Sequence, residues 1–120
     1  MSGAEAKSRE LGVDMDIAIS DECGRLLLFQ RMNDARITSI EIALDKSFTA
    51  AAARKSTRDY GETSGPSQKT FGINTSNQGR FSIVAGGLPI FVDGLCLGGV
   101  GCSSGSPDQD EIVAAAGIDE

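Results

Sequence analysis

Polar side chains next to glycines make residues 77–87 the segment best suited to binding a ligand. Asn77, Gln78 and Arg80 share one short stretch, and Gly86 and Gly87 follow closely. A guanidinium can hold a carboxylate or phosphate through paired hydrogen bonds. We therefore predict a binding site for a small anion around these five residues. Arg80 could equally tie loops together through carbonyl groups or an aspartate, and the sequence leaves both roles open.

A second candidate anion site lies where a predicted strand gives way to the last predicted helix. Its residues are Ser103, Ser104 and Gly105. Free N–H groups at a helix N-terminus attract anions. Ser106 can satisfy those groups itself as a cap, however, and Asp108 and Asp110 would compete with an anion. We include the three residues in the predicted ligand site with this alternative open.

Lys46 and Asp110 are the candidates for proton transfer, should the protein be an enzyme acting on a small carbonyl or carboxylate compound. A lysine works as a base or Schiff-base former when burial lowers its pKa. Lys46 falls outside the apolar stripe of its predicted helix, which favours a solvated side chain. Glu41 and Asp45 lie four residues apart on one helical face, a spacing that certifies no acid–base pair.

The composition excludes several functional classes. Among 120 residues there is no histidine, which rules out Ser-His-Asp triads, Cys-His dyads and His-ligated metals. Eleven basic against seventeen acidic residues give a net charge of -6 with no basic stripe, so we expect no nucleic-acid partner. A chain of this length accommodates one domain, and we assign residues 1–120 to it.

Cysteine usage and hydropathy indicate the cellular compartment of the protein. Cys23, Cys96 and Cys102 form no zinc-binding pattern, so no metal site is predicted. Cys96 and Cys102 share one predicted strand, roughly 20 Å apart, beyond disulfide reach. We expect three reduced thiols, mostly in the core. With no signal peptide or membrane-spanning segment in the sequence, we predict a cytoplasmic protein without a membrane partner.

Hydrophobic periodicity predicts the first half of the fold. Helix formers occupy residues 4–11, and residues 13–20 alternate between apolar and polar types, as in a half-buried strand. A turn and a returning strand at 25–30 complete a β-hairpin. Thr38 and Glu41 form the pattern of a capping box, with Ile37 and Ile42 as its hydrophobic staple. The helix that they open extends through the alanines at 50–53.

Glycines are frequent in the second half of the chain and separate its predicted elements. A short helical turn and an exposed loop are expected over 56–68, followed by strands at 81–85, 88–92 and 95–102. Asp93-Gly94 is a strong two-residue hairpin turn. Glycines at 98, 99 and 101 mark close approach of a ligand, a helix or a second chain. Ser106 and Gln109 form a capping box for the last helix. The order of elements predicts an α+β fold with an antiparallel sheet.

Four segments, in collinear order over most of the chain, resemble the GlcG/HbpS-like family. They are MDIAISDECGRLLLFQRMNDA, SIEIALDKSFTAAA, FGINTSNQGRFSIVAGGLPIFVDG and LGGVGCSSGSPDQDEIVAAAG. The pairing of NQGR with GGLPI, and GVGCSSGSPDQDE before the last helix, make the resemblance specific. It implies a profilin-like α+β fold, with a central antiparallel sheet flanked by helices, and homo-oligomers from tetramers to octamers. The first helix is expected to be shorter than in the family.

The resemblance also bears on the ligand. The family includes an accessory protein of glycolate-utilisation operons, an extracellular haem-binding sensor partner and a haem-binding domain attached to a corrinoid adenosyltransferase. Without histidine, a haem here would need Cys, Met, Tyr or Thr as its iron ligand. We therefore expect an oligomeric module that binds an organic acid or a tetrapyrrole. The alternatives are an enzyme of the kind described above and a structural or accessory assembly subunit.

Overall fold

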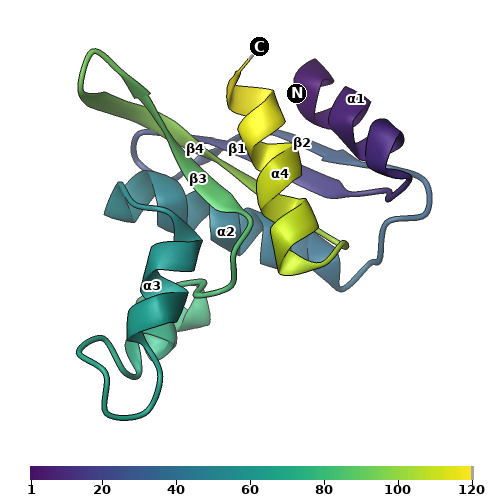
Figure 1. The fold of residues 1–120 in the computed structure, drawn as a ribbon. Helices are drawn as coiled ribbons and strands as arrows, with labels where there is room; N and C mark the ends of the chain where they lie inside the picture. Colours follow the sequence, from purple (N-terminus) through teal and green to yellow (C-terminus); the bar gives the residue numbers. More distant parts are fainter. Residues whose placement is uncertain (120) are drawn as a thin grey trace.

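A four-stranded antiparallel sheet forms the centre of the computed structural model, which describes residues 1–119 (Figure 1). Its strands are β1 (Asp16–Asp21), β2 (Leu26–Arg31), β3 (Gly87–Val92) and β4 (Leu95–Ser103), in the spatial order β2-β1-β4-β3. Two hairpins, β1–β2 and β3–β4, join where β1 pairs with β4. The predicted α+β architecture, an antiparallel sheet flanked by helices, is confirmed.

Helices cover both faces of this sheet (Figure 1). They are α1 (Ser2–Leu11), α2 (Ser39–Ala53), α3 (Thr57–Thr63) and α4 (Pro107–Ile118). Successive side chains of a strand point to opposite faces, so the contacts of β1 and β4 tell the two sides apart. Ile17 and Val100 pack in a core cluster with Val113 of α4. Gly99 and Gly101 of β4 instead face α2.

Bare backbone on β4 lets α2 approach the sheet very closely. A β-carbon added at Gly101 would lie 2.3 Å from the carbonyl oxygen of Ala43, and one at Gly99 would lie 2.7 Å from that of Ser47. Of the three partners considered, a ligand, a helix or a second chain, the structure places a helix against Gly99 and Gly101, whereas Gly98 faces the backbone of Ser20 in β1.

Local signals fix the ends of several elements. Asp93 and Gly94 both have positive φ, 52° and 80°, as a tight turn between β3 and β4 requires. At the start of α4, the Ser106 hydroxyl accepts a hydrogen bond from the Gln109 amide while the Gln109 side chain accepts one from Ser106 N. The hairpin turn and the second capping box are therefore confirmed.

Other predictions about local structure were wrong. Residues 81–85 form no strand, and the chain there runs as a loop against α2. The Thr38 side chain makes no cap hydrogen bond, and Ile37, 72% exposed, does not act as a buried staple. The polar face of β1 is buried, with Asp16 fully covered, because α2 packs on the side that alternation assigned to solvent.

The cysteines differ in their surroundings. All three are free thiols, as predicted, but only Cys102 is buried, while Cys96 is partly covered and Cys23 is exposed. Burial, together with the nearby Asp110 carboxylate, raises the pKa of the Cys102 thiol to about 12. Within residues 1–119 no helix combines the length and the hydropathy that crossing a bilayer requires.

Candidate functional site

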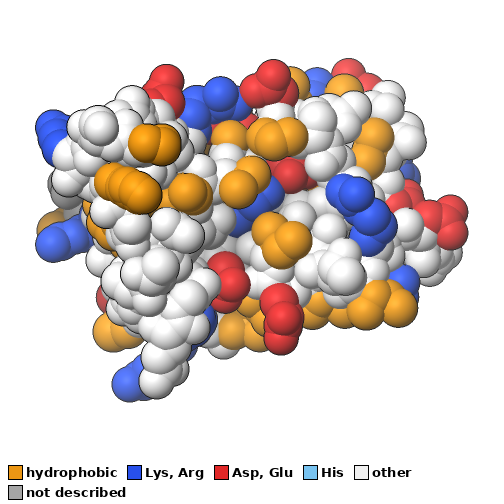
Figure 2. All heavy atoms as spheres, turned by 90° about the horizontal axis from the view of Figure 1, so that it is seen from below, with side chains coloured by type: hydrophobic (Ala, Val, Ile, Leu, Met, Phe, Trp, Pro, Cys, Tyr) orange, Lys and Arg blue, Asp and Glu red, His pale blue; other side chains and the backbone are white. Residues whose placement is uncertain are grey.

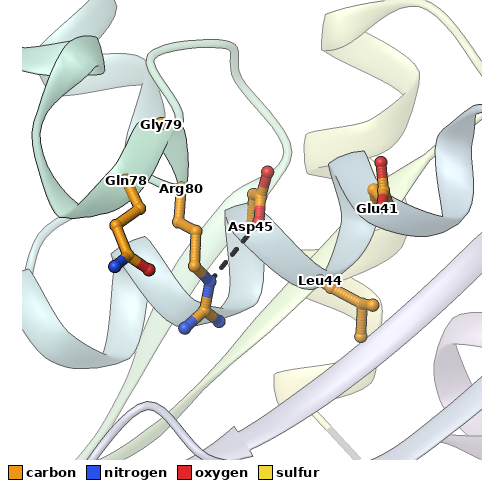
Figure 3. A pocket seen from close by; sticks show the side chains of 6 residues that line it. All are labelled: Glu41, Leu44, Asp45, Gln78, Gly79 and Arg80. Atoms are coloured by element: carbon orange, nitrogen blue, oxygen red, sulfur yellow. Dashed lines mark ion pairs between the residues drawn. The ribbon is translucent and has the colours of Figure 1, made fainter.

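A hollow of about 440 Å³ lies between α2 and the loop that leads to β3 (Figure 3). Its lining residues are Glu41, Leu44, Asp45, Gln78, Gly79 and Arg80. The volume lies within the usual range of small-ligand sites. Two of the residues predicted for ligand binding, Gln78 and Arg80, therefore share one cavity with two carboxylates of α2.

A left-handed turn presents the loop residues to this cavity. Asn77, Gln78 and Gly79 have φ values of 53°, 59° and 80° in succession. For a residue with a side chain, the left-handed helical conformation costs about 1–2 kcal/mol. Two such residues in a row are rare, and strained backbone of this kind clusters at functional sites.

Arg80 is held against α2 by its backbone. The Thr49 hydroxyl donates a hydrogen bond to the carbonyl oxygen of Arg80 (3.2 Å) and accepts one from the Ser82 amide (2.8 Å). The Thr49 side chain is almost completely buried, so this anchor is shielded from competing water. The loop therefore enters the site at a fixed position on the helix.

The Arg80 side chain lies over an aromatic ring with its donors available. Its Cζ stands 4.0 Å from the centre of the Phe48 ring, a cation–π contact. Its Nε is 3.7 Å from Asp45 Oδ1, too long for a hydrogen bond. Asp45 is its ion-pair partner among residues 1–119, and 47% of the side chain is exposed. Its N–H groups can accordingly receive an anion from solvent.

Positively and negatively charged side chains line different parts of the cavity. In Figure 3, Gln78 and Arg80 lie at one end and Glu41 at the other, with Asp45 between them. Burial raises the pKa of Asp45 and the nearby Glu41 carboxylate adds to that effect, while Arg80 opposes it. Acidic and basic side chains also lie close together on the face drawn in Figure 2, among separated apolar patches.

A smaller, more apolar hollow of about 160 Å³ adjoins the same turn. It is lined by Phe48, Thr49, Ala52, Ala53, Asn77 and Phe81. Asn77 thus lines this neighbouring hollow and not the larger cavity. Phe48 lies under the Arg80 guanidinium and lines the smaller hollow.

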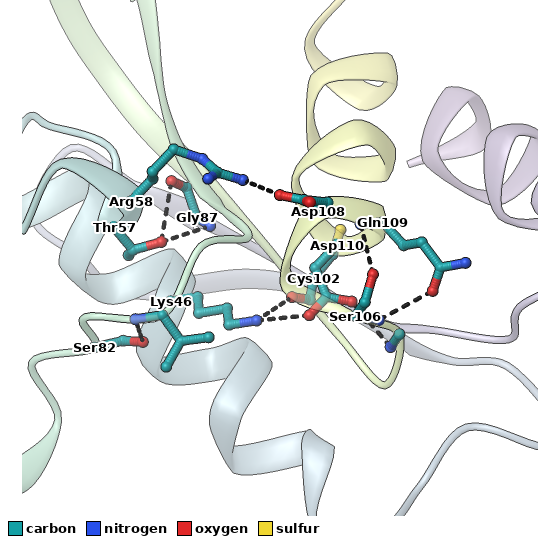
Figure 4. A network of polar contacts seen from close by, with 12 residues as sticks. Lys46, Thr57, Arg58, Ser82, Gly87, Cys102, Ser106, Asp108, Gln109 and Asp110 are labelled. Atoms are coloured by element: carbon teal, nitrogen blue, oxygen red, sulfur yellow. Dashed lines mark hydrogen bonds and ion pairs between the residues drawn. The ribbon is translucent and has the colours of Figure 1, made fainter. Parts of the chain in front are cut away.

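Lys46 and Asp110 form a buried ion pair away from the cavity (Figure 4). Lys46 Nζ lies 2.8 Å from Asp110 Oδ2 and donates to the carbonyl oxygen of Cys102 at 2.9 Å. Asp110 Oδ1 accepts the Gly105 amide at 2.9 Å. The two side chains are 1% and 3% exposed. The expectation of a solvated Lys46 was wrong, because α2 turns this residue onto the sheet where α4 begins.

The remaining predicted residues lie where β3 begins and where β4 leads into α4. A β-carbon at Gly86 would lie 2.7 Å from Lys46 Nζ, and the Gly87 amide donates to the hydroxyl of Thr57 at 2.9 Å. Ser103 is buried, and the Ser104 hydroxyl accepts the amide of Arg36 at 3.0 Å. The structure thus separates the predicted set, with Gln78 and Arg80 at the cavity, Asn77 at the smaller hollow, and Gly86, Gly87 and Gly105 beside the Lys46–Asp110 pair.

Sequence reasoning did not assign Glu41, Leu44, Asp45 and Phe48 to the site. Their spacing along one face of α2 was the available signal, since residues three and four apart are neighbours on a helix. What the spacing does not reveal is that the loop carrying Arg80 folds back onto that face.

Haem and metal ligation can be tested against the donors present. Residues 1–119 contain no group of three or more Cys, Asp or Glu side chains placed to hold a metal ion. Of the donors considered for haem iron, Met15, Met32 and Cys102 are buried in the core, and the Tyr60 ring packs against Phe81 at 4.7 Å. No Cys, Met, Tyr or Thr lines the cavity at Arg80. The lining residues therefore do not fit a haem.

Two proteins of known sequence are similar to this chain over almost its whole length. An uncharacterised 15.0 kDa protein from the dhaT-dhaS intergenic region of Citrobacter freundii is 37% identical over 96% of this chain and 81% of its own length. The corrinoid adenosyltransferase PduO of the same organism is 34% identical over 96% of this chain, which spans only 34% of that enzyme.

Solved structures agree with these matches. Protein ORFY of Klebsiella pneumoniae superposes with a TM-score of 0.96 at 32% identity, covering 98% of this chain and 81% of that one. A PduOC:heme complex superposes with a TM-score of 0.95 at 30% identity, covering 98% of this chain and 86% of that one. The family model described as "Haem degrading protein HbpS-like" matches residues 1–119. The chain therefore belongs to the HbpS-like family.

Proposed function

We propose that this protein is a ligand-binding module whose cavity at Arg80 holds a small organic carboxylate. The observation that carries the proposal is the Arg80 guanidinium, which stacks on Phe48, lines the cavity and is 47% exposed. A left-handed turn and the buried Thr49 hold the Arg80 backbone in place. Paired N–H···O bonds from a preorganised guanidinium match the geometry of a carboxylate.

The experiment is a calorimetric titration with small mono- and dicarboxylates at low ionic strength. We expect Arg80→Gln to abolish measurable carboxylate binding with little change in melting temperature. Arg25→Gln, an exposed arginine on the β1–β2 hairpin, is the matched control and should bind normally. Unchanged carboxylate affinity in Arg80→Gln would contradict the proposal, and collapse of the fold would assign Arg80 to structure.

The second candidate ligand is haem, which a specific observation favours. A relative 30% identical to this chain is solved as a haem complex. Against it, the cavity offers no Cys, Met or Tyr to the iron, and the chain has no histidine. A titration with haemin, followed at the Soret band, separates the candidates. A stoichiometric Soret shift that survives Arg80→Gln would favour haem bound elsewhere on the molecule.

An enzymatic role receives less support from the geometry. Lys46 and Asp110, the candidates for proton transfer, neutralise one another and are covered on all sides. A group that transfers a proton must come within hydrogen-bond reach of its substrate. We therefore propose binding, not catalysis, and place neither residue at the ligand site.

We further propose that the module assembles as a homo-oligomer, in the range of tetramer to octamer. Supporting this, large apolar side chains are exposed on β2 and on the β3–β4 hairpin: Leu26, Leu27, Leu28, Phe91, Val92, Leu95 and Leu97. Exposed apolar groups gathered on strands favour association. Light scattering coupled to gel filtration measures the mass directly, and a monomer at micromolar concentration would contradict assembly. This assembly also serves the alternative of an accessory subunit.

A further inference from the structure

Charge within the cavity narrows the class of ligand beyond a simple carboxylate. Its walls carry one guanidinium, Arg80, and two carboxylates, Glu41 and Asp45. A monocarboxylate paired with Arg80 would bring a third negative group into the same 440 Å³ space. Like charges at such separations repel, so the anion alone is a poor complement to these walls.

The acidic end has unused hydrogen-bonding capacity. Glu41 forms neither an ion pair nor a side-chain hydrogen bond within residues 1–119, and Asp45 has only the long 3.7 Å approach to Arg80. Ionised carboxylates accept hydrogen bonds from several donors at once. The arrangement in Figure 3 therefore leaves acceptors at the Glu41 end and donors at the Arg80 end.

We propose that the preferred ligand is a short zwitterion, an aminocarboxylate. Its carboxylate pairs with the Arg80 guanidinium and its ammonium lies between Glu41 and Asp45. An ammonium offsets the two wall carboxylates, which a hydroxyl or methyl group does not. Glu41 and Asp45 are one helical turn apart on α2, so their carboxylates are neighbours on the helix face that lines the cavity. This inference rests on the proposed carboxylate site and adds the second recognition element.

The test compares three ligands that share a propionate skeleton and differ only at the far end. β-Alanine carries an ammonium there, butyrate a methyl group and succinate a second carboxylate. We expect β-alanine to bind about three- to fivefold more tightly than butyrate, the size of one exposed ion pair. Succinate should bind more weakly than butyrate. Raising the salt concentration should shrink both differences.

Variants at two glutamates test whether the preference for β-alanine depends on the cavity wall. Glu41→Gln should reduce the preference for β-alanine over butyrate towards unity and raise butyrate affinity, because one wall carboxylate that repels the anion is removed. Glu22→Gln, an exposed glutamate on the β1–β2 turn, should keep the full preference.

The two proposals fail in different ways. Equal, Arg80-dependent affinities for β-alanine and butyrate would overturn the aminocarboxylate inference and leave the carboxylate site standing. Absence of Arg80-dependent binding for all three ligands would overturn both. A preference for β-alanine that persists in Glu41→Gln and in Asp45→Asn would place the ammonium elsewhere and also contradict the inference.

Discussion

Lys46 and Asp110 meet inside the protein with 2.8 Å between Nζ and Oδ2, although they are 64 positions apart in the sequence. The contact joins α2 to α4, and the same ammonium binds the carbonyl oxygen of Cys102 at the end of β4. The two helices and the sheet strand β4 are thereby linked through one charged group (Figure 4).

Removing one member of this pair should destabilise the protein severely. Lys46→Met leaves the Asp110 carboxylate buried without its counter-ion, and such changes cost about 3–5 kcal/mol. We expect urea unfolding to report a loss of that order. Lys69→Met, at an exposed loop position, is the control and should change little. A double variant, Lys46→Met with Asp110→Leu, should recover part of the loss, and a double variant no better than Lys46→Met alone would argue against an uncompensated charge as the cause.

Adding a methyl group at Gly101, where β4 contacts α2, should destabilise the protein. In Gly101→Ala the new methyl group would lie 2.3 Å from the carbonyl oxygen of Ala43 and 2.4 Å from the amide of Ser47. Because backbone atoms cannot rotate away, the helix must shift, and overpacking of this kind costs about 1–3 kcal/mol. Thermal unfolding measures the loss.

Gly117 supplies the contrast within α4. A β-carbon there would lie 3.3 Å from the β-carbon of Ala4, a tight contact with a side chain and not with backbone. Since the gain of about 1 kcal/mol in helix propensity offsets part of this crowding, Gly117→Ala should cost far less than Gly101→Ala. Equal destabilisation by both substitutions would contradict the steric explanation.

The sequence predicts most of the fold because the relevant signals are local. The turn at Asp93-Gly94, the Ser106 cap and the helix ending at Ala53 all depend on neighbouring residues, and all were found. The strand expected at 81–85 fails for a non-local reason. Thr49 of α2 binds the backbone on either side of Phe81, and those hydrogen bonds replace a strand ladder.

The candidate site was less predictable than the fold. Arg80 and Gln78 stood out by type, but Glu41 and Asp45 were noted only as neighbours on one helical face whose spacing certifies no acid–base pair. Lys46 was misassigned because amphipathic periodicity locates apolar contacts only. A lysine that is buried against a carboxylate and a carbonyl breaks the pattern without leaving a local signature.

Asp16 should make stability depend on pH. It is fully buried, and neither carboxylate oxygen has a hydrogen-bond partner within residues 1–119. Burial raises the pKa of Asp16, with Arg31 opposing the shift. The folded state therefore binds the proton more tightly than the unfolded state, and the free energy of unfolding should fall as pH rises from the ordinary aspartate pKa of 3.8 through the raised value.

Asparagine at this position tests the argument, because it keeps the shape and removes the ionisation. Asp16→Asn should stabilise the protein at pH 7 by about 1–2 kcal/mol and flatten this part of the pH dependence. Urea unfolding at several pH values measures both effects. Asp34→Asn, an exposed loop aspartate, should change neither. A loss of stability in Asp16→Asn at pH 7 would mean that the ionised carboxylate is needed in the fold.

The strained turn before Arg80 should lower the stability of the fold and strengthen ligand binding. Gln78 has a φ of 59°, so Gln78→Gly should stabilise the fold by about 0.5–1 kcal/mol, the relieved strain being partly offset by glycine's freedom in the unfolded chain. The same substitution removes an amide from the cavity wall and loosens the turn that positions Arg80. Affinity for butyrate should therefore fall severalfold. Ser67→Gly, at a φ of 67° in a loop that does not line the cavity, should give a similar gain in stability with unchanged affinity. If both variants bind butyrate equally well, the turn's strain has no part in presenting Arg80.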